Sequence, residues 1–87
     1  MAYSIAILPA ALRQLAELPK PDQKRIKEKI DRLGIEPRPL GVKPLHGKHE
    51  HLRIRSGDYR IIYTVDDDRR HILIVVIGHR REVYRGL

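Results

Sequence analysis

Residues 51–65 read HLRIRSGDYRIIYTV, two runs of strand character on either side of the turn-forming triplet Ser56-Gly57-Asp58. Successive side chains of a strand point to opposite faces of a sheet, so Leu52 and Ile54 share one face of the first run and its basic residues share the other. These basic residues are His51, Arg53 and Arg55. The second run, 59–65, is β-branched and aromatic. The stretch predicts an antiparallel hairpin with one cationic face.

A further strand is expected directly after this hairpin. Asp66-Asp67-Asp68 supplies a turn, and residues 70–77 are apolar on both faces, as in a strand with neighbours on each side. Gly78 is expected to end that strand. The last stretch, 79–85, is too short and too charged for a core element, and we expect a turn or a short helix there.

The N-terminal residues predict a strand followed by a helix. Residues 3–8 are rich in isoleucine and stop at Pro9, which suits the first turn of a helix. Apolar residues then recur at helical spacing as far as Leu18, and Pro19-Lys20-Pro21 ends the helix.

A second helix is expected to follow that proline-rich turn. Asp22 is predicted to cap it, because a carboxylate accepts the free amide hydrogens of a first turn. Gly34 is a plausible C-terminal stop. Residues 36–44 contain three prolines and a glycine and are expected to lack regular structure.

The predicted order is therefore β-α-α-β-β-β, an α+β fold with a helical hairpin packed on one face of an antiparallel-rich, four-stranded sheet. The 87 residues are expected to form a single domain, 1–87. The N-terminus has no signal-peptide pattern, the longest apolar run is too short to cross a bilayer, and cysteine is absent. We expect a cytoplasmic protein.

The chain is strongly basic, with a net charge of +7. Residues 37–87 carry eleven Lys and Arg against six Asp and Glu, so most of the excess lies in the predicted sheet half. A field of this sign attracts polyanions. Nucleic acid or an acidic protein is the expected partner.

The candidate functional residues are cations separated in the sequence. His51, Arg53 and Arg55 alternate along one strand about 7 Å apart, Arg60 begins the next strand, and Arg80 follows the last. Side by side, these strands would form one concave basic surface. The competing interpretation is an ordinary solvated outer face. Arginine, which grips phosphate with two hydrogen bonds, outnumbers lysine in the chain, and this favours the functional interpretation.

Other chemistries find less support. The histidines lack the spacing of metal ligands, and the acidic triplet at 66–68 is typical of an exposed turn. No glycine-rich phosphate loop or Ser-His-Asp arrangement can be nominated. We expect no cofactor and no metal.

Three blocks of the sequence resemble the RelE branch of the RelE/ParE toxin superfamily: 43–47 (KPLHG), 52–63 (LRIRSGDYRIIY) and 78–84 (GHRREVY). With the preceding β-α-α pattern, the resemblance covers nearly the whole chain. It implies a ribosome-dependent mRNA endonuclease that cuts the codon in the ribosomal A site. In that family the ribose 2′-hydroxyl attacks the adjacent phosphate, and the protein positions groups, neutralises charge and moves protons.

The resemblance also implies individual roles. Arg53 and His51 match basic positions that are usually lysine, the first assisting removal of the 2′-hydroxyl proton. Arg60 matches an arginine that stabilises the phosphorane-like charge, Arg80 an arginine that protonates the leaving 5′-oxygen, and Tyr84 a tyrosine that stacks on a base. Further RNA contacts are expected from Lys43, Lys48, Arg55, His79, Arg81 and Arg85.

Two departures from the family pattern leave the general base open. Arg53 is a poor proton acceptor because a guanidinium stays charged. His51 is the alternative, because an imidazole titrates near neutrality, and His79 competes with it for that role.

The resemblance implies a RelB-like acidic antitoxin as partner, with operator DNA bound only through their complex. Two other functions stay open at this stage. One is a ParE-like toxin that poisons DNA gyrase without RNA chemistry. The other is a catalytically degenerate member that binds only its antitoxin and their DNA. Part of the arginine-rich face would then serve the antitoxin rather than RNA.

Overall fold

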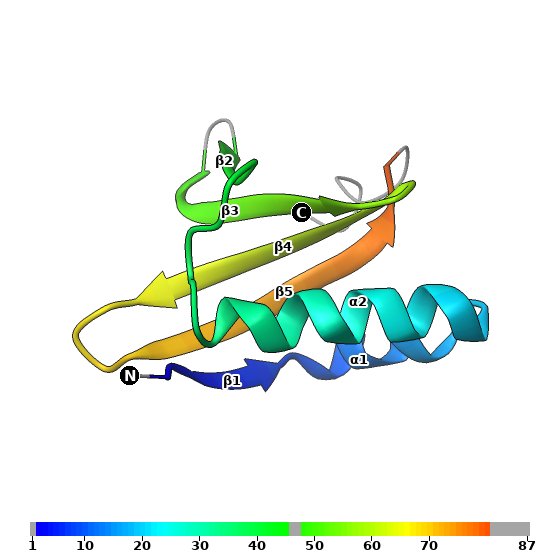
Figure 1. Ribbon diagram of the computed structural model, residues 1–87, viewed down its shortest axis with the longest axis horizontal. Helices are drawn as coiled ribbons and strands as arrows, with labels where there is room; N and C mark the ends of the chain where they lie inside the picture. Colours follow the sequence, from blue (N-terminus) through cyan, green and yellow to red (C-terminus); the bar gives the residue numbers. More distant parts are fainter. Residues whose placement is uncertain (1, 46–47, 81–87) are drawn as a thin grey trace.

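The computed structural model describes residues 2–45 and 48–80. These residues form two helices and five strands in succession (Figure 1). Their bounds are β1 (Ser4–Ile7), α1 (Pro9–Ala16), α2 (Lys20–Leu33), β2 (Lys43–Leu45), β3 (Lys48–Ser56), β4 (Tyr59–Asp66) and β5 (His71–His79).

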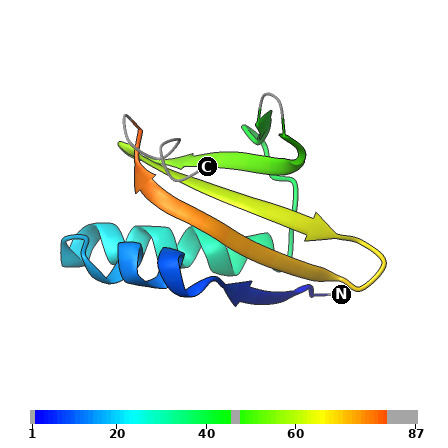
Figure 2. The same ribbon diagram turned by 180° about the vertical axis from the view of Figure 1, so that it is seen from behind.

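The strands form one sheet in the order β1-β5-β4-β3-β2, and both helices lie on the same side of it (Figures 1 and 2). β1 runs parallel to β5, whereas the other neighbouring pairs are antiparallel. The predicted α+β class and the helical layer on one face are confirmed. β5 lies between β1 and β4, which explains its apolar residues on both faces.

The sheet has one strand more than predicted, because β2 begins at the end of the segment 36–44 that was expected to be irregular. Lys43 pairs with Arg53 and Pro44 with Leu52. A proline is tolerated here because β2 is an edge strand, where a missing N–H leaves no inner ladder bond unmade.

The second helix begins earlier than predicted. It starts at Lys20, with Pro19 as the capping residue and no side-chain cap, so the prediction that Asp22 caps it was wrong. Proline fits the first helical turn, where its absent N–H is not needed, and Pro21 is therefore part of α2. The Gln23 side chain completes the tight turn between the helices by donating to the carbonyls of Ala16 (3.1 Å) and Leu18 (2.8 Å).

Gly34 ends α2 as predicted, but its backbone is in the ordinary helical region, with φ −63°. Its role is to let the backbone before β1 come close to the end of α2, since the Tyr3 N–H donates to the Gly34 carbonyl at 2.6 Å. A Cβ at this position would lie 3.2 Å from the Tyr3 carbonyl oxygen and 3.3 Å from the Ile5 Cδ1. The absence of a side chain lets the end of α2 touch β1.

The β3–β4 turn has Gly57 in the left-handed region, with φ +60°, which glycine adopts at no steric cost. At the same end of the sheet, Gly78 was expected to end the last strand, and this was wrong. β5 continues through Gly78 to His79, because Arg60 and Tyr59 at the start of β4 pair with those two residues.

The main core lies between the helices and the sheet. Ile26, Ile30 and Leu33 of α2 pack there with buried side chains of β4 and β5, among them Tyr63 and Ile74. A smaller apolar cluster of Leu45, Ile62 and Val76 lies apart from it, with one residue each from β2, β4 and β5. The sheet therefore has apolar material on both faces.

Candidate functional site

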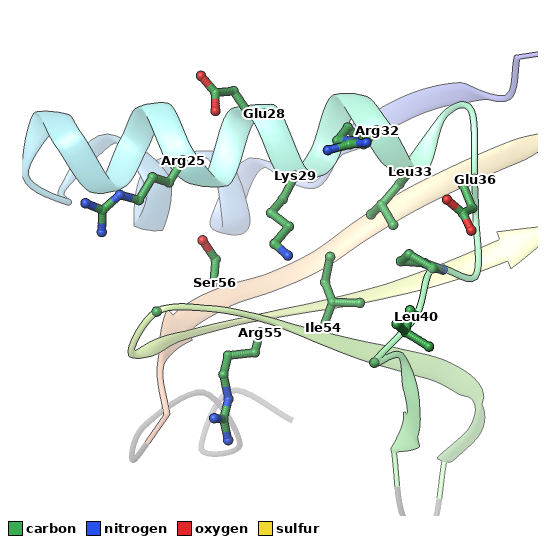
Figure 3. A pocket seen from close by; sticks show the side chains of 13 residues that line it. Arg25, Glu28, Lys29, Arg32, Leu33, Glu36, Leu40, Ile54, Arg55 and Ser56 are labelled. Atoms are coloured by element: carbon green, nitrogen blue, oxygen red, sulfur yellow. The ribbon is translucent and has the colours of Figure 1, made fainter.

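The two faces of β3 differ as the sequence predicted. Leu52 and Ile54 pack on the core beneath the helices, and in Figure 3 Ile54 and Ser56 point toward α2 whereas Arg55 points away from it. Strand alternation places Arg53 on the same side as Arg55. We call this side of the sheet, turned away from the helices, the basic face.

Strand register brings cations from three strands together on the basic face. Lys43 of β2 pairs with Arg53 of β3, which pairs with Ile62 of β4. One row further along, Arg55 pairs with Arg60. Directly opposed residues of an antiparallel pair lie about 5 Å apart at their Cβ atoms, so these positions are neighbours.

The arginines of this face differ in exposure. Arg55 is exposed, whereas Arg53 and Arg60 are half-buried. The Arg60 Nη1 donates to its neighbour's carbonyl, that of Tyr59, at 3.5 Å. The apolar cluster of Leu45, Ile62 and Val76 lies on the same face. Charge next to buried apolar surface interacts more strongly with an anion than charge in open water.

His51 continues this arrangement along β3. It pairs with Thr64 of β4 and precedes Arg53 by two residues, so it lies on the basic face, about 7 Å along the strand. Its side chain is half-buried. Lys43, His51, Arg53, Arg55 and Arg60 are thus cationic positions of this face.

His79 lies on the other side of the sheet. It pairs with Tyr59, which packs against the core beneath the helices, and the two rings meet edge to face with centroids 6.0 Å apart. Backbone register therefore separates His79 from His51, its competitor for the role of general base.

Arg80 is attached to the β3–β4 turn through its backbone, since its N–H donates to the Asp58 carbonyl at 2.8 Å. It follows Gly78, which lies opposite Arg60, by two residues. The end of β5 thus brings residue 80 beside the row that holds Arg55 and Arg60.

The side chains of four predicted site residues lie outside the described part of the structure. Arg81, Tyr84 and Arg85 lie outside the described residues, as does the side chain of Lys48. Their proposed roles remain predictions.

Acidic residues gather at the opposite end of β4. Asp67, in the β4–β5 turn, accepts two hydrogen bonds from Arg38, at 3.1 and 3.0 Å, and one from the Tyr3 hydroxyl at 2.8 Å. Arg38 holds the pKa of the Asp67 carboxyl below its usual range, with a further contribution from Tyr3. Within residues 2–45 and 48–80, no group of side chains is suited to hold a metal ion, and no helix could span a membrane.

One residue that the sequence interpretation passed over touches the backbone of β5. The Gln14 Oε1 of α1 accepts a hydrogen bond from the Ile77 N–H at 2.9 Å. The sequence does contain a signal for this contact. Gln14 lies three residues after Ala11 and four before Leu18, so it is a polar residue at the edge of the apolar stripe of the helix.

Comparison with known proteins identifies the family. The family model of the ParE toxin of type II toxin–antitoxin systems matches residues 5–84. The RelE toxin of Mycobacterium tuberculosis is 36% identical over 95% of this chain and 87% of its own length, and the RelG toxin of the same organism is 31% identical over 98% and 99%. The chain is a RelE-type toxin of a type II toxin–antitoxin system.

Solved structures agree with this assignment. The archaeal RelE–RelB complex of Pyrococcus horikoshii contains a chain that is 34% identical, with a TM-score of 0.81 over 92% of this chain and 97% of that one. The RelBE2 complex of Mycobacterium tuberculosis matches with a TM-score of 0.81 at 28% identity. The RelE architecture is therefore a helical pair on a mostly antiparallel sheet, and in this toxin the other face of that sheet carries the basic cluster.

Proposed function

We propose that this RelE-type toxin is a ribosome-dependent endoribonuclease that cuts mRNA at the A-site codon, acting in the cytoplasm. The observation that supports this most is the convergence of Lys43, Arg53, Arg55 and Arg60 from three strands on the basic face, with His51 beside them. An RNA phosphate bound there would meet donors from several directions. Such an arrangement stabilises charge that develops in a transition state.

The reaction needs no cofactor, because the RNA supplies its own nucleophile. The ribose 2′-hydroxyl loses a proton to a base and attacks the adjacent phosphorus, the bond to the 5′-oxygen breaks, and that oxygen takes up a proton. A 2′,3′-cyclic phosphate and a 5′-hydroxyl end result. In this scheme Arg53 and Arg60 stabilise the pentavalent phosphate, and Arg80 serves the leaving oxygen.

His51 is the proposed general base. Arg53 is an unsuitable acceptor because a guanidinium remains protonated at neutral pH. His79 lies on the other side of the sheet, against Tyr59. His51 occupies the basic face two residues from Arg53, so an imidazole there is within reach of the same ribose–phosphate unit.

A RelB-type antitoxin is the proposed partner, because the two structural relatives described above were solved as toxin–antitoxin complexes with RelB proteins. A basic surface favours an acidic segment, which would neutralise the charge needed for RNA. Binding of operator DNA by the complex would then depend on the antitoxin.

The activity is tested with purified toxin and ribosomes that carry a defined message. Transcript ends are mapped by primer extension, with the same message free in solution as the control. Cuts within the A-site codon that require the ribosome support the proposal. Intact message under saturating toxin would overturn it.

A second function is favoured by one finding, the match to a family model described as the ParE toxin. In this alternative the scaffold poisons DNA gyrase and cuts no RNA. The two are separated in cells by their first effect, since a nuclease blocks protein synthesis whereas a gyrase poison induces the response to DNA damage.

A further inference from the structure

β5 contains a β-bulge shortly before its C-terminal end, the end that leads to Arg80. Ile62 of β4 pairs with Val76 and the next residue, Tyr63, pairs with Ile74, so Val75 is an extra residue that has no partner in the β4 register. A bulge of this kind bends a strand and changes which way the following side chains point.

The bulge sets the face on which the end of β5 presents its residues. Ile72 and Ile74 point to the core beneath the helices, and in a regular strand residues 76, 78 and 80 would follow them there. Because Val75 is extra, Ile77 takes the core position instead, and Val76 joins the apolar cluster of the basic face. Gly78 then lies opposite Arg60. Strand alternation carried one step beyond β5 places residue 80, whose N–H donates to the Asp58 carbonyl, on the side of the arginines.

Beyond the bulge β5 stays paired with β4 on one edge, and on its other edge α1 takes the place of β1. The pairing of β1 with β5 ends at Ile74, whose carbonyl accepts the Leu8 N–H at 3.0 Å. Past that point α1 packs along β5 (Figure 2). The Ile77 N–H, one residue after Val76, finds its acceptor in the Gln14 side chain at 2.9 Å. This bond is half-buried, so its loss would leave an amide hydrogen poorly satisfied.

We propose that Gln14 is a positioning residue for Arg80. By accepting the Ile77 N–H, it fixes the bulge at Val75 and thereby keeps Gly78 and His79, and Arg80 directly after β5, in the register that serves the basic face. The hydrogen bond from the Arg80 N–H to the Asp58 carbonyl holds the other end of this short segment. This inference rests on the proposed nuclease function, because it assigns Gln14 an effect on the residue that is proposed to serve the leaving oxygen.

The test compares single-turnover cleavage on programmed ribosomes for Gln14→Leu, which removes the acceptor, and Gln14→Glu, which keeps an oxygen at the same reach. A misplaced catalytic group costs up to about 100-fold in rate. We expect Gln14→Leu to cut at least about ten-fold more slowly at saturating toxin, with the half-saturating toxin concentration unchanged, and Gln14→Glu to recover most of the rate. Amide hydrogen exchange at Ile77 should be faster in the leucine variant than in the glutamate variant. If Gln14→Leu does not fold, Gln14→Asn, whose amide is one methylene shorter, replaces it.

Gln23→Leu is the matched control. It also removes a glutamine that holds backbone, but the two carbonyls it binds lie in the turn between the helices. We expect this control to lose stability and to keep the wild-type cleavage rate. If the wild type cuts the message and the Gln14 variants cut it at the same rate, the inference about Gln14 is wrong and the proposed function stands. Equal losses of rate in Gln14→Leu and Gln23→Leu would have the same meaning. A wild-type toxin that cuts no message overturns the proposed function and the inference with it.

Discussion

At the scale of single residues, the basic face predicts that His51 and the arginines act differently. An arginine contributes charge at any pH used, whereas an imidazole can accept and return a proton. His51→Ala should therefore lower the cleavage rate about 100-fold or more while ribosome binding persists. The rate is measured in single-turnover cleavage and the binding by co-sedimentation. Arg13→Ala, on an exposed position of α1, is the control and should cleave normally.

An unchanged rate in His51→Ala would remove this residue from the mechanism. The proposed roles of Arg53 and Arg60 in stabilising charge would be unaffected by that result, because they depend on charge and strand register and not on proton transfer.

Tyr63 carries a second prediction at this scale. Its ring is fully buried in the core, and its hydroxyl donates to the Pro37 carbonyl at 2.7 Å, which secures the segment between α2 and β2. Tyr63→Phe removes this bond and should lower the free energy of unfolding by about 1 to 3 kcal/mol, measured by urea denaturation at pH 7. Tyr3→Phe, which loses an exposed hydrogen bond, should cost less. Equal costs for the two variants would contradict the prediction.

The pKa of Tyr63 determines how its contribution to the free energy of unfolding changes with pH. Burial raises the pKa of Tyr63 to about 12 from an ordinary value near 10. The stability that this group contributes is therefore present below about pH 10 and is lost as the pH rises toward 12. Tyr63→Phe lacks the phenol, so it should lose less stability over that range than the wild type.

At the scale of elements, the end of α2 is limited by its contact with β1. A methyl group at Gly34 would lie 3.2 Å from the Tyr3 carbonyl oxygen, a backbone atom that cannot turn aside. Gly34→Ala should therefore destabilise the protein by about 1 to 3 kcal/mol, although alanine is the better helix former. Thermal denaturation checks this, with exposed Lys27→Ala in the middle of α2 as the control. A more stable Gly34→Ala variant would show that β1 shifts without cost.

The elements also show which parts of the fold could be predicted from the sequence. Alternation in β3 correctly divided Leu52 and Ile54 from Arg53 and Arg55, because one face must be buried and the other need not be. The strand β2 was not predicted, since Pro44 disfavours a strand unless it lies at an edge, and only the assembled sheet shows which strands are edges.

The candidate site shows the same limit. The cations on β3 and β4 could be assigned from alternation and the intervening turn, which are local. The bulge at Val75 could not, because it arises where β4, β5 and the Gln14 side chain meet. For that reason the sequence left His79 as a competitor of His51 for the role of base, whereas in the structure the two lie on different sides of the sheet.

At the scale of the whole molecule, the arginines of the basic face and the aspartates of the β4–β5 turn lie toward opposite ends of β4, and Arg38 and Arg69 pair with aspartates of that turn. The arginines of the basic face lie near the start of β4, and the acidic turn lies at its end. Asp67 joins that turn to two remote segments, since it accepts hydrogen bonds from Arg38 before β2 and from Tyr3 before β1. Acidic residues at this end therefore stabilise the fold without weakening the positive potential at the other end.

This tether predicts how stability depends on acid. Arg38, with help from Tyr3, lowers the pKa of Asp67 in the folded protein, so the tether stabilises above the ordinary carboxyl pKa and is lost as the pH falls through the folded value. Asp67→Asn should be less stable than the wild type at pH 7, and the difference should shrink at pH 3 and in high salt. Urea denaturation at pH 7, 5 and 3 measures it, with Asp68→Asn in the same exposed turn as the control. A difference that stays constant from pH 7 to pH 3 would mean that the charge of Asp67 contributes nothing, and that its hydrogen bonds hold the three segments together on their own.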